Sequence, residues 1–196
     1  MTIDEICEKY EIENYTVNDD GTIDVNGNVD LDRKYLTELP LNFNRVTGFF
    51  TCTHNQLTTL KGSPRWVGGS FFCGVNKLTS LEFSPDYVGV DFSCRENDLT
   101  DLVGSPKETG SYFNCAGNQN LTNPKGASEK IGKYFYCVNT PLEYIFNNVD
   151  RNFLHAFNFY KIIKEDIVNL KRLKYVMNLY GQRIDLDMIQ KYYRIV

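Results

Sequence analysis

Hydrophobic and polar residues repeat along the middle of the chain with a period of about 21 residues. The clearest marker is a cysteine that recurs at intervals of 21, 21, 21 and 22 residues, at Cys52, Cys73, Cys94, Cys115 and Cys137. A fixed period in the twenties is typical of solenoids, in which each repeat forms one turn and packs only against its neighbours. The pattern therefore predicts one elongated repeat domain.

Each repeat opens with alternating apolar and polar positions. In the third repeat, Val67, Phe71 and Cys73 fall on one side of an extended chain, whereas Ser70 and Phe72 fall on the other. Alternation with a period of two predicts a β-strand. We therefore expect one strand per repeat, over about residues 67–73 in this case, and a parallel sheet whose Val, Phe and Cys side chains face inward.

The second half of each repeat carries different signals. Four repeats have an asparagine three residues after the cysteine, at Asn55, Asn76, Asn97 and Asn118. An amide both donates and accepts, so a stacked row of asparagines can pair backbone groups at the corner after the strand. Ser-Pro pairs follow on the return leg, where proline disfavours helix. The return leg is therefore predicted to be extended or turn-like.

These motifs resemble a known family. Phe-x-Cys-x-x-Asn-x-Leu resembles the leucine-rich-repeat core, Leu-x-Leu-x-x-Asn-x-Leu, and the longer run Asn-x-Leu-Thr-x-Leu-x-Gly-x-Pro is most similar to leucine-rich-repeat proteins of tailed bacteriophages and, more distantly, to bacterial effector repeats. The resemblance covers about residues 25–142 and implies an α/β repeat solenoid of about six units. It implies no catalytic residue, because such repeats serve many unrelated partners. One departure is that glycine stands in place of the leading leucine, at Gly68, Gly89, Gly110 and Gly132.

Both ends of the chain depart from the repeat. Thr2-Ile3-Asp4-Glu5 is a capping box that predicts a helix to about Tyr10, and residues 18–21 predict a turn between two short strands. After Leu142, apolar residues adopt helical spacing, which predicts a helix that includes Ile163 and Ile167 and ends at Gly181, and a last helix over 186–194. The expected organisation is an N-terminal cap at 1–24, a solenoid at 25–142 and a C-terminal helical cap at 143–196.

The residues between the inward-facing positions should line the outer, concave face of the sheet. Exposed aromatic residues are typical of the energetically important positions in protein interfaces. We therefore predict a partner-binding surface composed of Phe49, Phe72, Asp91, Arg95, Tyr112, Tyr134 and Tyr136. Two alternatives stay open: the rings pair only with one another across the strands, or the C-terminal helices cover them.

Charge is unevenly distributed along the chain. The net charge is −4, and the basic excess falls in the C-terminal region. The basic side chains there form an alternative binding surface, for an acidic protein, a second copy of the chain or nucleic acid, made of Lys171, Arg172, Lys174, Lys191 and Arg194. Nucleic acid is the less favoured partner, because the whole chain lacks the strongly basic balance that phosphate binding usually needs.

Few residues suggest catalytic or metal chemistry. His54 and His155 are the two histidines, and neither has an evident nucleophile or acid–base partner in the sequence. Cysteines stacked in a row about 4.8 Å apart cannot converge on one zinc ion, so neither a metal nor another cofactor is expected. No apolar run reaches the length of about 18 residues that a membrane helix needs. With no signal segment at the acidic N-terminus, the sequence favours a cytoplasmic protein with reduced thiols.

The sequence thus predicts a non-enzymatic protein-binding module. The resemblance to bacteriophage proteins implies a host protein, a defence or metabolic factor, as the partner that it would inhibit, and then the host cytoplasm as its location. The alternatives are nucleic-acid binding through the basic C-terminal region and a structural or virion component. A homo-oligomer stays open.

Overall fold

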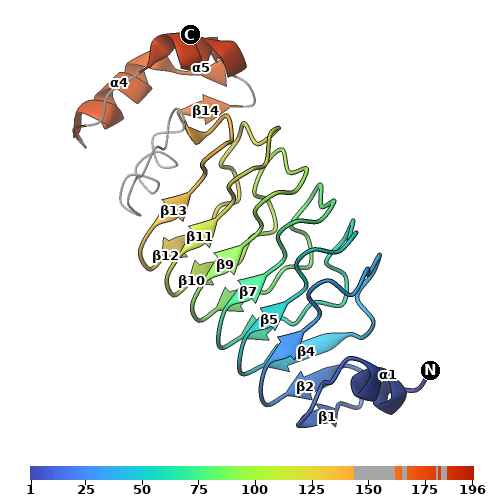
Figure 1. Ribbon diagram of the computed structural model, residues 1–196. Helices are drawn as coiled ribbons and strands as arrows, with labels where there is room; N and C mark the ends of the chain where they lie inside the picture. The colour runs from blue at the N-terminus through green and yellow to red at the C-terminus, as the bar shows by residue number, and fades with distance from the viewer. Residues whose placement is uncertain (144–161, 165–166, 180, 182–184) are drawn as a thin grey trace.

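The computed structural model describes residues 1–143, 162–164, 167–179, 181 and 185–196. The repeats stack as successive coils of a parallel β-solenoid, which confirms the solenoid predicted from the 21-residue period (Figure 1). Helix α1 (Ile3–Lys9) lies at the N-terminal end of the stack, and α4 (Leu170–Leu179) and α5 (Leu186–Tyr192) lie at the opposite end. The coils themselves contain little helix.

Each coil contributes two short strands to two different sheets, so the prediction of one continuous strand per repeat was wrong. The seven-stranded sheet contains β1 (Tyr15–Val17), β2 (Ile23–Val25), β4 (Phe43–Val46), β6 (Trp66–Val67), β8 (Tyr87–Val88), β10 (Glu108–Thr109) and β12 (Lys130–Ile131). The six-stranded sheet contains β3 (Val29–Asp30), β5 (Phe50–Thr51), β7 (Phe71–Phe72), β9 (Phe92–Ser93), β11 (Phe113–Asn114) and β13 (Phe135–Tyr136).

Glycine explains the bend between the two strands of a coil. A Cβ atom on Gly89 would lie 2.1 Å from the carbonyl oxygen of Gly68, and one on Gly110 would lie 1.9 Å from that of Gly89. Because successive backbones come this close at the bend, any side chain here would overlap the coil before it. Gly68, Gly89, Gly110 and Gly132 are therefore the residues at which the third to sixth coils turn, and Thr47 takes the equivalent position in the second coil.

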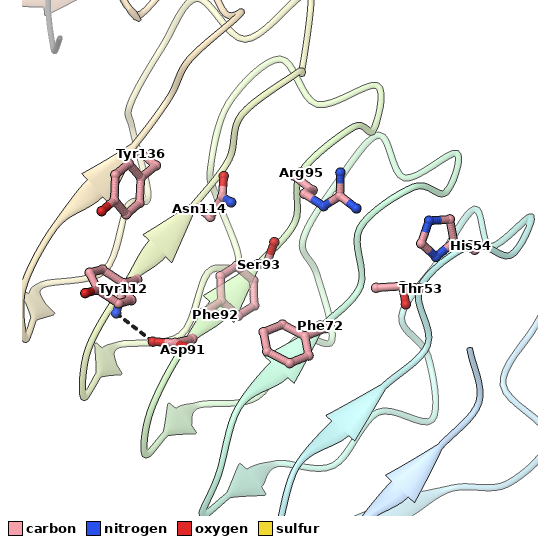
Figure 2. Close-up of a pocket in the computed structure, with 10 residues that line it drawn as sticks. All are labelled: Thr53, His54, Phe72, Asp91, Phe92, Ser93, Arg95, Tyr112, Asn114 and Tyr136. Carbon is pink, nitrogen blue, oxygen red and sulfur yellow. Dashed lines mark hydrogen bonds between the residues drawn. The ribbon is translucent and has the colours of Figure 1, made fainter. Parts of the chain in front are cut away.

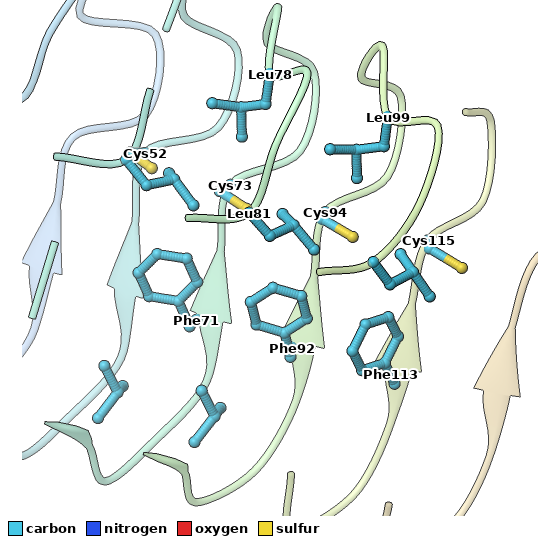
Figure 3. Packing of buried hydrophobic residues seen from close by; sticks show 14 of the residues in the cluster. Cys52, Phe71, Cys73, Leu78, Leu81, Phe92, Cys94, Leu99, Phe113 and Cys115 are labelled. Atoms are coloured by element: carbon cyan, nitrogen blue, oxygen red, sulfur yellow. The ribbon is translucent and has the colours of Figure 1, made fainter. Parts of the chain in front are cut away.

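The interior of the solenoid is built from rows of identical side chains that successive coils contribute from the second coil on (Figure 3). The phenylalanine rings of successive coils lie with their centroids 5.0–5.8 Å apart from Phe50 to Phe135. The cysteine row beside them is free of disulfides and buried, and burial raises the pKa of the Cys137 thiol to about 12. The thiols therefore remain protonated and fill space as small apolar groups.

The asparagine row has the predicted role. The Asn97 amide nitrogen donates to the carbonyl oxygens of Cys73 and Cys94, at 3.1 and 3.0 Å, and its oxygen accepts from the Leu78 backbone N–H at 3.0 Å. Each asparagine thus joins its own coil to the previous one. In the sixth coil, Thr140 stands three residues after the cysteine instead, and its hydroxyl donates to the Cys137 carbonyl oxygen at 2.6 Å.

The N-terminal cap forms as predicted. The Thr2 side chain accepts from the Glu5 backbone N–H, and the Glu5 carboxylate accepts from the Thr2 backbone N–H, which completes the capping box of α1. Strands β1 and β2 form the expected antiparallel hairpin. Strand β2 also pairs in parallel with β4, so this hairpin provides the first edge of the seven-stranded sheet.

The C-terminal region mixes helices with a small sheet, which corrects the all-helical prediction. Ile163 lies in β14 (Ile163–Lys164) and Ile167 in β15 (Ile167–Val168). Strand β15 pairs with β14 on one side and with β16 (Arg194–Ile195) on the other. The β-branched side chains of the two isoleucines suit strands. The last helix ends at Tyr192, so Arg194 belongs to a strand. Of the predicted C-terminal helical cap at 143–196, residues 144–161 lie outside the described residues.

A hydrogen bond between described residues joins this C-terminal region to the solenoid. The hydroxyl of Tyr193 donates to the Thr122 carbonyl oxygen at 2.6 Å, and the Tyr193 side chain is buried. The inner faces of α4 and α5 are buried as well, through Leu173, Val176, Met177 and Ile189. These helices therefore pack as part of the core.

Candidate functional site

The outer face of the six-stranded sheet carries a groove of about 380 Å³. It corresponds to the face that the sequence predicts to be concave. The side chains that line this groove come from the second to the sixth coils (Figure 2). They are Thr53, His54, Phe72, Asp91, Phe92, Ser93, Arg95, Tyr112, Asn114 and Tyr136. None of the described residues of the C-terminal helices is among them.

The groove exists because side chains of different size occupy one row of the sheet. Phe72, Ser93, Asn114 and Tyr136 stand at equivalent positions in β7, β9, β11 and β13. Ser93 and Asn114 are small, so they form a low floor between Phe72 on one side and Tyr136 on the other (Figure 2). Three coil steps separate these two walls, or about 14 Å at the usual spacing of strands.

Three tyrosines cluster at the C-terminal side of the groove. The ring centroid of Tyr112 lies 6.0 Å from that of Tyr134, with the rings stacked, and 5.5 Å from that of Tyr136. Tyr134 is 49% exposed and does not line the groove, whereas Tyr112 and Tyr136 are half-buried and do. Part of the aromatic surface is thus used in pairing within the protein, and part remains open to a ligand.

Two opposite charges lie at the two ends of the groove. Asp91, Ser93 and Arg95 alternate along one coil, so the α-carbons of Asp91 and Arg95 are about 13 Å apart. The Asp91 carboxylate accepts from the Tyr112 backbone N–H at 3.1 Å. The Arg95 guanidinium forms an ion pair with the neighbouring Glu96.

A hydrogen-bonded cluster flanks the groove on its N-terminal side. The Asp32 carboxylate accepts from the Thr53 hydroxyl at 2.6 Å and from Nδ1 of His54 at 2.8 Å. Burial alone would raise the pKa of the Asp32 carboxyl, but these two hydrogen bonds and the adjacent Arg33 guanidinium hold that pKa below its usual value. Nε2 of His54 lies 3.4 Å from an Arg33 nitrogen, so both ring nitrogens already have partners.

The structure brings together most of the side chains predicted to bind on this face. Phe72, Asp91, Arg95, Tyr112 and Tyr136 all line the groove, whereas Phe49 and Tyr134 lie on the same face outside it. Sequence reasoning did not single out Thr53, His54, Phe92, Ser93 and Asn114 as site residues, and it expected Phe92 to face inward. The alternation placed Thr53, Ser93 and Asn114 on this face, but nothing in the pattern shows that small side chains between large ones create depth.

The basic residues predicted as an alternative surface are only partly brought together. Lys171 and Arg172 line a second hollow of about 460 Å³, together with Asn169, Tyr175 and Val196. Lys174, Lys191 and Arg194 are exposed but do not line that hollow.

In the described part of the chain, no group of three or more His, Cys, Asp or Glu residues could hold a metal ion. No helix in that part is long and apolar enough to cross a membrane. The chain matches no protein-family model, no curated protein and no solved structure.

Proposed function

We propose that this chain is a leucine-rich-repeat-type protein-binding module that holds its partner in the groove of the six-stranded sheet. The observation that carries the proposal is the groove itself, which combines a polar floor with aromatic walls on a regular sheet. Tyrosine and arginine are enriched at the centres of protein interfaces. Because hydrogen bonds join each coil to the next, the walls are held in place before a partner arrives, and less entropy is lost on binding.

The hydrogen bonding in the groove favours binding over catalysis. A general base needs a free lone pair within reach of the substrate. Nδ1 of His54 is taken by Asp32, and Nε2 faces Arg33. The Thr53 hydroxyl donates to Asp32 rather than to a base. These groups form a closed network that supports the rim of the groove.

The identity of the partner follows only from the family resemblance. If the chain is a bacteriophage protein, as its repeat idiom suggests, the partner is a host protein whose activity the complex would alter. The function proposed is therefore non-enzymatic inhibition by binding.

Removing the aromatic walls should abolish partner capture. We expect a tagged chain carrying Phe72→Ala, Tyr112→Ala and Tyr136→Ala to retain less than about a tenth of the partner that the wild-type chain captures from bacterial lysate, because aromatic anchors contribute about 2 kcal/mol or more each. The measurement is quantitative mass spectrometry of the captured proteins.

The control for that experiment is Tyr87→Ala. Tyr87 lies in β8 of the other sheet, where its ring stacks on Trp66 with centroids 5.7 Å apart. This variant removes a stacked ring without touching the groove, so it should capture the partner as the wild type does. Equal capture by the triple variant and the wild type, with both folded by circular dichroism, would contradict the proposal.

A second candidate function is nucleic-acid binding at the basic C-terminal surface. The observation that favours it is the hollow of about 460 Å³ lined by Lys171, Arg172 and Tyr175, which combines two cations with a ring that a base could stack on. It ranks below protein binding because Asp185 and Asp187 add negative charge to the same region.

This second function predicts steeply salt-dependent binding of single-stranded DNA. The combination Lys171→Gln, Lys174→Gln and Lys191→Gln should weaken binding at low salt at least tenfold and flatten its dependence on salt, since each lost phosphate contact lowers the slope by about 0.7 for single strands. The matched control replaces three lysines on the return legs by glutamine, at Lys61, Lys77 and Lys125. The measurement is fluorescence anisotropy of labelled single-stranded DNA. Failure of the wild-type chain to bind this DNA in 20 mM salt would contradict this second function.

A further inference from the structure

We infer that the groove accepts an arginine side chain of the partner, with its guanidinium paired to Asp91 and stacked on the surrounding rings. The inference rests on the proposed function and deepens it, because it names the chemical group that the partner must offer. It follows from three features of the groove: a fixed and uncompensated carboxylate, a neutralised arginine and a set of aromatic faces that already attracts a cation.

The Asp91 carboxylate is held in position but is not neutralised. One carboxylate oxygen accepts from the Tyr112 backbone N–H at 3.1 Å. The backbone N–H of Asp91 donates to the Ser70 hydroxyl at 3.3 Å. Within the described residues, no nitrogen of lysine, arginine or histidine lies within 4.0 Å of this carboxylate. The other oxygen, Oδ2, has no hydrogen-bond donor in that part of the chain either. It is thus available to an incoming cation.

The charges of Arg95 and Asp32 beside the groove are already paired. The Arg95 guanidinium meets the Glu96 carboxylate, and Asp32 meets Arg33 and His54. An ion pair has a much weaker field at a distance than an isolated charge, so neither of these pairs offsets the charge of Asp91. An acidic ligand would meet this uncompensated carboxylate, whereas a cationic one would neutralise it.

The rings near Asp91 add to the attraction for a cation. Aromatic faces carry partial negative charge and bind guanidinium or ammonium groups within about 6 Å of the ring centroid. The ammonium group of Lys133 lies 5.4 Å from the centroid of the Tyr112 ring. The chain's own lysine therefore shows that this ring takes a cation, and it would compete with a ligand for the site.

Arginine suits the site better than lysine. Its planar guanidinium can stack on a ring and still direct two N–H groups at a carboxylate, which the compact ammonium of lysine cannot do. The chain stacks a guanidinium on a ring elsewhere, since the Arg45 guanidinium lies 3.5 Å from the centroid of the Trp66 ring. The span of about 14 Å between Phe72 and Tyr136 leaves room for the arginine stem and for flanking backbone.

The test is a titration of the full-length chain with the peptide acetyl-Gly-Arg-Gly-amide, followed by two-dimensional NMR of its backbone amides. We expect saturable shifts centred on Ser93, Tyr112 and Asn114. Peptides with citrulline or lysine in place of arginine are the comparison. Citrulline keeps the shape and loses the charge, so it should give no saturation, and lysine should bind at least fivefold more weakly.

Variants of the chain separate the role of the carboxylate from that of the fold. Asp91→Asn keeps an oxygen that can accept from the Tyr112 N–H, so it should fold normally and bind the arginine peptide at least tenfold more weakly. Asp98→Asn, at an exposed position on the return leg, should bind as the wild type does. Lys133→Gln should bind more tightly, because it removes the competing cation.

The inference and the proposed function fail in different ways. Equal affinity for the arginine and citrulline peptides, or an unchanged affinity in Asp91→Asn, overturns the inference even if protein capture still depends on the aromatic walls. Equal affinity for the lysine peptide overturns the choice of guanidinium. A third outcome is that the arginine peptide binds, but the triple aromatic variant captures the same proteins from lysate as the wild type. That outcome supports the cation site and contradicts the proposed function.

Discussion

Replacing Phe71 by alanine is expected to lower the free energy of unfolding by about 3–5 kcal/mol, the usual cost of deleting a buried aromatic ring. The Phe71 side chain is fully buried, and its ring lies between those of Phe50 and Phe92, with centroids 5.4 and 5.8 Å away. Backbone hydrogen bonds hold the flanking coils at their spacing, so these coils cannot close the cavity. Because domains of this kind have a total stability of about 5–15 kcal/mol, the loss is a large fraction of it.

The measurement is urea unfolding followed by the fluorescence of Trp66, the single tryptophan of the chain. Phe83→Ala is the matched control, because Phe83 lies on the return leg and is 51% exposed. Its loss should cost less than about 1 kcal/mol. If the two variants lost the same stability, the stacked phenylalanine row would not be the main stabilising feature of the solenoid.

Replacing Asn97 by aspartate should lower the free energy of unfolding by about 3 kcal/mol at neutral pH, although the two side chains have nearly the same shape. The amide nitrogen of Asn97 donates to the carbonyl oxygens of Cys73, Cys94 and Arg95. A carboxylate could still accept from the Leu78 N–H, but it would face these carbonyl oxygens without any proton to donate. The buried charge therefore repels its surroundings and loses its hydration.

This loss should depend on pH. The folded state would favour the neutral form of the introduced carboxyl group, so its folded pKa would lie above its unfolded value and the destabilisation would grow as pH rises through that range. Asn120→Asp, at an exposed position of the one-residue insertion in the fifth coil, controls for the added charge. The measurement is the free energy of unfolding at pH 4 and pH 7. If the Asn97 variant and this control lost the same stability at both pH values, the role of the asparagine row would be contradicted.

The candidate site was predictable in composition but not in shape. Alternation along the strands is enough to place Phe72, Tyr112 and Tyr136 on one face, because side chains of a strand point alternately to its two sides. The groove also needs Ser93 and Asn114 to lie between these rings, which depends on the parallel register of β7, β9, β11 and β13. Tyr134 was expected to bind with the others, but it lies outside the groove, where it stacks on Tyr112.

Two features of the fold also depended on contacts between distant residues. The bend in the fourth to sixth coils follows from the approach of glycines 21 or 22 residues apart, as between Gly89 and Gly110. In the C-terminal region, Ile163 and Ile167 have a spacing of four that suits a helix, yet they lie in two strands that pair with each other, and the strand of Ile167 also pairs with β16 near the end of the chain. Helical spacing is a local signal, and strand pairing across this distance overrides it.

The sequence by itself determined the solenoid, its period, the inward rows of phenylalanine and cysteine, the asparagine row and the N-terminal cap. Each of these is encoded either locally or by exact repetition, so that one repeat predicts the environment of the next. The tertiary structure decided the two-strand coil, the small C-terminal sheet, the depth of the groove and the charge left unpaired in it. The physical reason is that these depend on distances between coils and on which partner each polar group finds, and neither is written in a single repeat.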